Sequence, residues 1–80
     1  MTYSEKLIAL GLNIAYYRKL RLLTQEKLAE KAEISISTVR KLENPNMFTG
    51  VSFEMICVLA AALEVTESEL LDFRNPNKTV

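Results

Sequence analysis

Residues 24–44, TQEKLAEKAEISISTVRKLEN, contain the pattern from which the fold can be predicted. Thr24 is a residue type that caps helix N-termini, since its hydroxyl accepts a hydrogen bond from a backbone N–H of the first turn. The residues after it place apolar side chains along one side of a helix. The sequence therefore predicts a short helix over 25–32, with its apolar side formed by Leu28, Ala29 and Ala32.

A second short helix follows after a joint of three residues, 33–35. Ser35 can cap it, and Pro45 ends it because the residue before a proline is pushed out of the helical region. We expect this helix over 36–44, with Ile34 as the apolar plug of the joint. Two short helices joined this tightly form a helix-turn-helix, with axes about 90–120° apart.

The second of these helices has two distinct sides. Val39 and Leu42 anchor one side to the core. The other side carries two cations and no anion, with Ile36 at its edge, and consists of Ser37, Arg40, Lys41 and Asn44. Such a side is either an ordinary solvated surface or a surface that enters the major groove of DNA, which is wide enough for one helix. In the second case Arg or Lys donates to guanine and Ile36 contacts a thymine methyl.

The start of the helix over 25–32 has two interpretations as well. Amide donors and the positive end of the helix dipole favour a phosphate there, and Gln25 adds a side-chain donor. Alternatively, Thr24 is only a cap and Gln25 an exposed residue without a role.

The rest of the chain is also expected to be helical. Thr2 followed by Glu5 is typical of a capping box that opens a helix over 3–22. Ser52 can cap a fourth helix ending near 63, and Thr66 with Glu69 opens a short fifth helix that includes Leu70, Leu71 and Phe73. No internal repeat is visible. We expect an all-α, compact five-helix bundle in residues 1–73, followed by a flexible C-terminal tail in residues 74–80.

The amino-acid composition argues against several classes of function. With no His and one Cys, the chain lacks the usual zinc ligands and the commonest general base, so we expect no metal, no cofactor and no enzyme activity. One Cys excludes an internal disulfide and fits the cytoplasm. No uncharged run approaches the roughly 20 residues that span a bilayer, so no membrane partner is expected.

Charge is unevenly distributed although the net charge is zero. Residues 1–44 contain eight basic and five acidic residues, whereas residues 45–80 contain two basic and five acidic residues. The N-terminal part can therefore present a basic face to a polyanion. Ordinary scatter of solvated charges remains the alternative.

Three segments together resemble the Cro/Xre-type helix-turn-helix family, which includes the lambda-type phage repressors. They are Asn13–Lys19 (NIAYYRK), Leu23–Ala29 (LTQEKLA) and Ile34–Asn44 (ISISTVRKLEN). The segment Leu59–Thr66 followed by Leu70 and Leu71 is similar to the closing helices of the family. The resemblance covers about residues 7–73 and implies a lambda repressor-like fold.

The resemblance also implies roles for individual residues. It implies base-facing positions at Ile36, Ser37, Arg40 and Lys41, and phosphate contacts at Gln25 and Asn44; Thr24, at the same helix start as Gln25, is the third phosphate-contact candidate. Arg18 and Glu43 match a structural ion pair between the first helix and the recognition helix. The implied function is a phage or prophage-type repressor that binds double-stranded DNA as a homodimer on a pseudo-palindromic operator.

The sequence departs from the family pattern at three positions. The family often has Gly at the positions of Leu22, Glu33 and Pro45. Glu33 is strained by about 1–2 kcal/mol if the joint keeps a left-handed backbone, and Pro45 gives the following loop another path. In that loop Met47 and Phe48 either fold back on the core or face a protein partner. An antitoxin, or another protein-interaction module with a partner such as a toxin, is therefore the alternative function.

Overall fold

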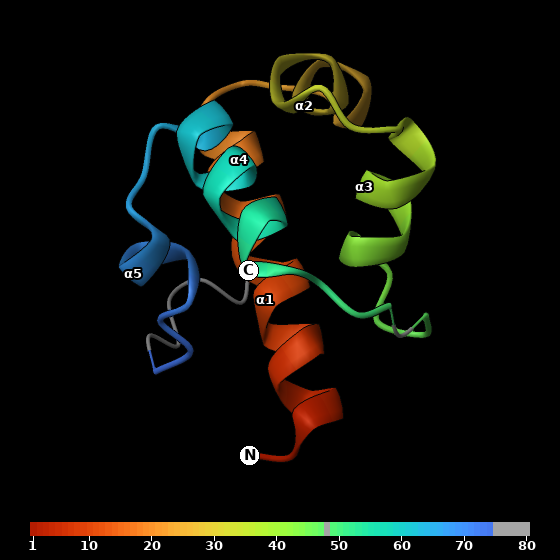
Figure 1. Ribbon diagram of the computed structural model, residues 1–80, viewed down its shortest axis with the longest axis vertical. Helices are drawn as coiled ribbons and strands as arrows, with labels where there is room; N and C mark the ends of the chain where they lie inside the picture. The colour runs from red at the N-terminus through yellow and green to blue at the C-terminus, as the bar shows by residue number, and fades with distance from the viewer. Residues whose placement is uncertain (48, 75–80) are drawn as a thin grey trace.

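The computed structural model describes residues 1–47 and 49–74. These residues form five helices and no strand, which confirms the all-α expectation (Figure 1). The helices are α1 (Tyr3–Leu20), α2 (Gln25–Ala32), α3 (Ile36–Glu43), α4 (Phe53–Leu63) and α5 (Glu67–Leu70).

The longest helix, α1, is the centre of the arrangement. It contacts α3, α4 and α5, and α2 bridges α3 and α4. In the view of Figure 1, α3 lies to the right of α1, α5 to the left and α4 in front. The core between them is mainly aliphatic, and its largest fully buried side chains are Ile14, Leu28, Val39, Leu59, Leu63 and Leu70.

Local capping explains where each helix begins. All five begin after a Ser or Thr whose hydroxyl accepts a hydrogen bond from the backbone N–H three residues later. The predicted caps Thr24 and Ser35 accept from Lys27 and Thr38 at 3.0 and 3.1 Å. Capping boxes are complete at α1 and α5. Because each cap depends on neighbouring residues only, the sequence alone predicts where these helices begin.

Three helix ends lie earlier than the sequence indicated. The first helix ends at Leu20 rather than near 22, because Leu22 adopts a left-handed backbone with φ 59°. The third ends at Glu43, since Asn44 is extended before Pro45. The fifth ends at Leu70, short of Phe73. There the buried Asn13 amide donates to the carbonyls of Leu70 and Asp72 at 2.8 and 3.0 Å. These bonds hold the chain after α5 against α1.

The turns after α2 and α4 are built alike. Glu33 and Glu64 both adopt left-handed backbones, with φ 57° and 59°. The next residue, Ile34 or Val65, donates at 3.0 Å to a carbonyl five residues earlier, which closes a Schellman-type turn. The segments LAEKAEIS (28–35) and LAAALEVT (59–66) therefore form a local structural repeat, although the sequence was expected to contain no internal repeat.

Gly11 lies at a close contact between α1 and α3. It is buried, and a Cβ atom built on it would collide with the backbone carbonyl of Leu42. Only glycine lets the two helices approach this far, so Gly11 fixes how far α3 stands from the core.

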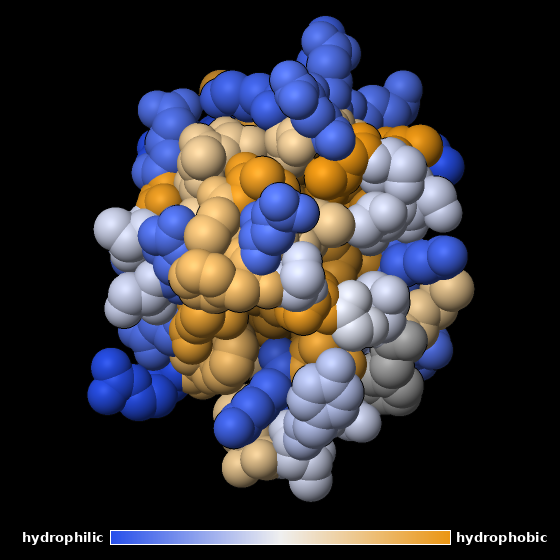
Figure 2. All heavy atoms as spheres, in the orientation of Figure 1, coloured by the Kyte–Doolittle hydropathy of each residue, from blue (hydrophilic) through white to orange (hydrophobic). Residues whose placement is uncertain are grey.

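The face on the α4 side of the molecule shows apolar surface broken by charged side chains (Figure 2). Phe53, at the start of α4, is 71% exposed. Among the described residues, the structure contains no helix with the length and hydropathy that crossing a bilayer requires.

Candidate nucleic-acid interface

The surface of α3 separates into the two sides that its sequence indicates. Val39 is fully buried and Leu42 nearly so, which fixes the rotation of the helix against the core. Ser37, Arg40 and Lys41 are exposed on the opposite side, and Ile36 is half-buried at its edge. The structure thus brings three of the four expected base-facing residues onto one exposed side of α3, whereas Ile36 at its edge packs partly against the core.

The two cations of this side are available for a ligand. Neither Arg40 nor Lys41 forms an ion pair within the part of the chain that the structure describes. The acidic residue of α3, Glu43, points away from them toward α1. The exposed side of α3 therefore has uncompensated positive charge, which attracts phosphate and guanine acceptors.

Glu43 is the centre of a polar network that fixes α3 to its neighbours. Arg18 donates to its carboxylate through Nε at 2.8 Å and through a terminal nitrogen at 2.9 Å. Another terminal nitrogen of Arg18 donates to the carbonyl of Leu23 at 2.9 Å. Gln25 Nε2 donates to Glu43 Oε1 at 3.1 Å. One carboxylate thus links the ends of α1 and α3 with the start of α2.

This network bears on the residues expected at the phosphate backbone. Gln25 directs its amide nitrogen at Glu43, while Thr24 caps α2 through its hydroxyl. The contact between Gln25 and Glu43 has no signal in the sequence, because the two residues are 18 positions apart. The backbone N–H groups at the start of α2 remain the natural donors for a phosphate there.

Asn44 lies half-buried at the end of α3, where its side-chain oxygen accepts from the backbone N–H of Asn46 at 2.9 Å. This bond lies at the start of the loop between α3 and α4. Met47 is 47% exposed in that loop. The expectation for Phe48, the other apolar residue of this loop, lies outside the described residues.

Arg21 is a further residue whose role the sequence did not reveal. It donates to the carbonyls of Leu63 and Glu64 at 2.9 and 3.1 Å, and so caps the C-terminal end of α4. Because the two partners are backbone atoms more than 40 residues away, no local pattern marks it. The only feature that the sequence shows is that Arg21 is a basic residue directly after the end of α1.

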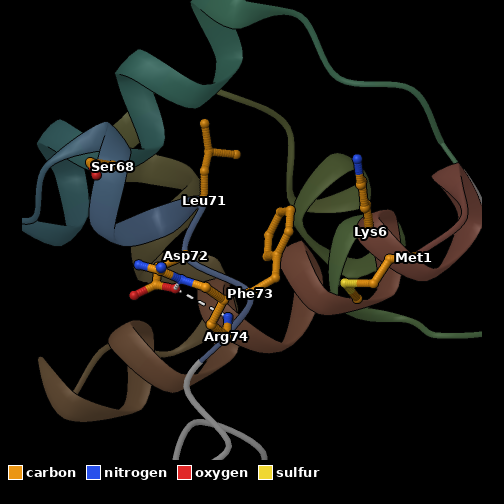
Figure 3. A pocket seen from close by; sticks show the side chains of 7 residues that line it. All are labelled: Met1, Lys6, Ser68, Leu71, Asp72, Phe73 and Arg74. Carbon is orange, nitrogen blue, oxygen red and sulfur yellow. Dashed lines mark hydrogen bonds and ion pairs between the residues drawn. The ribbon is translucent and has the colours of Figure 1, made fainter.

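Other parts of the surface offer less chemistry. A depression of about 560 Å³ lies at the opposite end of α1, between its first turns and the chain after α5 (Figure 3). Its lining mixes apolar and charged side chains: Met1, Lys6, Ser68, Leu71, Asp72, Phe73 and Arg74. No group of three metal-ligating side chains occurs among the residues described.

Comparison with known proteins gives one finding. The family model described as Helix-turn-helix matches residues 14–70, which cover most of the chain and all of α2, α3, α4 and α5. No curated protein and no solved structure matches.

Proposed function

This chain belongs to the Cro/C1-type helix-turn-helix family, a family of DNA-binding regulators, and from that premise we propose that it regulates transcription by binding one operator sequence. The observation that carries the proposal is the exposed side of α3, where Arg40 and Lys41 lack ionic partners among the described residues. A helix with this surface, fixed by a buried opposite side, suits the major groove.

Each candidate residue has a proposed task. Arg40 and Lys41 donate to guanine or nearby phosphates, Ser37 contacts a base edge, and Ile36 packs on a thymine methyl. Phosphate contacts come from the start of α2, at Thr24 and Gln25, and from the end of α3 at Asn44. Arg18 and Glu43 act structurally, since their paired side chains are only 12% and 7% exposed.

The finer features of the proposal follow the resemblance. Residues 1–73 act as one DNA-binding domain without enzyme activity, in the cytoplasm. The protein represses transcription as a homodimer on a pseudo-palindromic operator, and such dimers read half-sites about 34–36 Å apart. The antitoxin alternative is favoured by the exposed apolar residues Met47 and Phe53. It predicts one stoichiometric protein partner in addition to DNA.

The test is selection of bound sequences from a random DNA pool at a stated salt concentration, followed by affinity titrations. We expect a palindromic consensus and an affinity that falls steeply with salt. Arg40→Ala and Lys41→Ala should each weaken binding by about 1–3 kcal/mol where the residue pairs with a base. Lys6→Ala removes an exposed cation from the distant end of α1 and serves as the matched control. Unchanged affinity and sequence preference in both α3 variants contradict this assignment.

A further inference from the structure

The side of α1 opposite its buried residues carries one acid and one base with apolar side chains between them, of which Tyr16 also packs against the core and against the ring of Tyr17. At 100° per residue, six side chains gather within an arc of about 100° opposite the buried Leu10, Ile14 and Tyr17. We call these six the outer α1 stripe: Glu5, Ile8, Leu12, Ala15, Tyr16 and Lys19. Glu5 and Lys19 are exposed, Leu12 is 40% exposed, and the other three are half-buried.

This stripe differs from the usual outer surface of a helix. Surface helices carry charged or polar residues opposite their buried side. In α1, residues 7–17 contain no charged residue, so both sides of the helix are apolar there. A helix that is apolar all round is normally covered on all sides.

We propose that the outer α1 stripe pairs with the same stripe of a second copy of this chain, with the two α1 helices antiparallel. The two-fold axis passes at Leu12, which contacts its own counterpart. Ile8 and Tyr16 each lie four residues from Leu12, so each faces the other across the pair. Glu5 and Lys19 each lie seven residues from Leu12 and meet at both ends of the pair.

The charges at the two ends of the outer α1 stripe favour a second copy of this chain as its partner and fix the relative direction of the two α1 helices. A parallel pair would place Glu5 beside Glu5, whereas the antiparallel pair forms two Glu5–Lys19 ion pairs. Lys19 has no ion pair with any residue in the described ranges. Glu5 Oε1 accepts from the Thr2 backbone N–H at 2.7 Å, and Oε2 can accept from Lys19 of the second copy. The stripe is therefore complementary to itself, as an isologous interface requires.

This inference deepens the homodimer of the proposed function by naming its surface. The stripe lies opposite the side of α1 that faces the core, while α3 and α5 flank α1 on the right and left in Figure 1. A two-fold axis perpendicular to α1 within the stripe keeps each α3 on the same side of the pair.

One helix pair buries less surface than a standard protein interface of about 1,200–2,000 Å². The dimer should therefore be weak, and its population should depend on protein concentration.

Cross-linking tests the register in a Cys57→Ser background. Leu12→Cys places two thiols at the axis, and we expect a disulfide-linked dimer under mild oxidation. Ile8→Cys is the control, because two copies of position 8 lie about 12 Å apart along the pair, beyond the reach of a disulfide. A mixture of Ile8→Cys and Tyr16→Cys chains should form the heterodimer. Equal cross-linking of Leu12→Cys and Ile8→Cys overturns the proposal.

Sedimentation equilibrium without DNA tests the charges. Lys19→Glu should weaken the dimer at least tenfold, whereas Lys6→Glu, outside the stripe, should leave it unchanged. Adding Glu5→Lys to Lys19→Glu should restore the dimer, with thermal melting used to check that each variant is folded. A chain that stays monomeric at every concentration, or a Lys19→Glu variant that dimerises normally, contradicts the pairing.

Two further variants separate competing outcomes. Leu71 is exposed to the same 40% as Leu12, but it lies after α5. If Leu71→Glu dissociates the dimer and Leu12→Glu does not, the dimer forms through the C-terminal region and the proposal is wrong. A dimer that fails to bind DNA refutes the proposed function but not the pairing. A Lys19→Glu monomer that keeps salt-dependent DNA binding supports both proposals.

Discussion

Arg18 and Glu43 join the end of α1 to the end of α3 through two hydrogen bonds of 2.8 and 2.9 Å. Both side chains are largely shielded from water, with 12% and 7% exposed. This pair positions the helix that we propose as the DNA reader, and a third bond from Gln25 adds α2 to the same carboxylate. The interface thus depends on residues that do not themselves face the ligand.

Arg18→Met should destabilise the fold strongly, because it leaves the Glu43 carboxylate shielded and without its cation. Loss of one member of a buried pair costs about 3–5 kcal/mol of unfolding free energy. Chemical denaturation measures the change. Arg40→Met, which removes an exposed Arg from α3, should change stability by less than about 0.5 kcal/mol. Similar small effects in both variants would show that the pair contributes little.

Gly11→Ala should destabilise the protein although alanine is the better helix former. Helix propensity alone favours alanine by about 1 kcal/mol. The new methyl group, however, meets the carbonyl of Leu42, which belongs to backbone and has little freedom to move. Overpacking of this kind costs about 1–3 kcal/mol.

The control for Gly11 is Gly50→Ala in the loop before α4, where the new Cβ would lie 3.6 Å from the Tyr3 hydroxyl. That distance is ordinary van der Waals contact, so we expect little change in melting temperature. If Gly11→Ala melts at or above the temperature of the parent protein, α1 and α3 can separate without cost.

Local and long-range features were not equally predictable from the sequence. The caps at Thr24 and Ser35 and the two sides of α3 depend on residues within one or two turns, so their patterns are visible in the chain. Gly11 and Asn13 act through Leu42 and Leu70, which are distant in sequence. Nothing near Gly11 or Asn13 indicates these contacts, because they arise only when the helices pack.

The ion pair of Arg18 and Glu43 is an intermediate case. Their spacing of 25 residues carries no local signal, and it was the family resemblance that paired them. The contact of Gln25 with Glu43 was indicated neither by the sequence pattern nor by the resemblance. The resemblance to the family indicated a left-handed backbone at Glu33, but it gave no such indication for Glu64.

The thiol of Cys57 should react slowly with alkylating reagents at neutral pH. Burial raises its pKa, and the carboxylate of Glu67 raises it further through charge and a hydrogen bond. The reactive thiolate is therefore scarce until the pH rises above the usual range of a thiol. Labelling rates measured against pH report this pKa.

Glu67→Gln should lower the pKa of Cys57 and speed labelling at pH 8. Glu54→Gln is the comparison, because Glu54 makes the smallest contribution to the shift and its removal should have a smaller effect. If both variants label at the parent rate, burial alone sets the reactivity of Cys57.

Glu33 combines backbone strain with a negative charge at the joint of α2 and α3. Its φ of 57° lies in the left-handed region, which costs a residue with a Cβ about 1–2 kcal/mol. Glu33→Gly should remove this strain and stabilise the protein by about 1 kcal/mol or less, since glycine also gains freedom in the unfolded chain. Glu33→Ala keeps the strain and should not stabilise the fold.

The charge of Glu33 gives a second expectation, for DNA binding. If α2 approaches phosphate, both variants should bind DNA more tightly at low salt, and the gain should shrink as salt screens the charge. Glu64→Gly relieves the same strain at the matching turn after α4, but it also removes the exposed ion pair of Glu64 with Lys31 at 3.5 Å, so it should stabilise the fold less than Glu33→Gly. Equal stability of Glu33→Ala and Glu33→Gly would rule out strain at this joint.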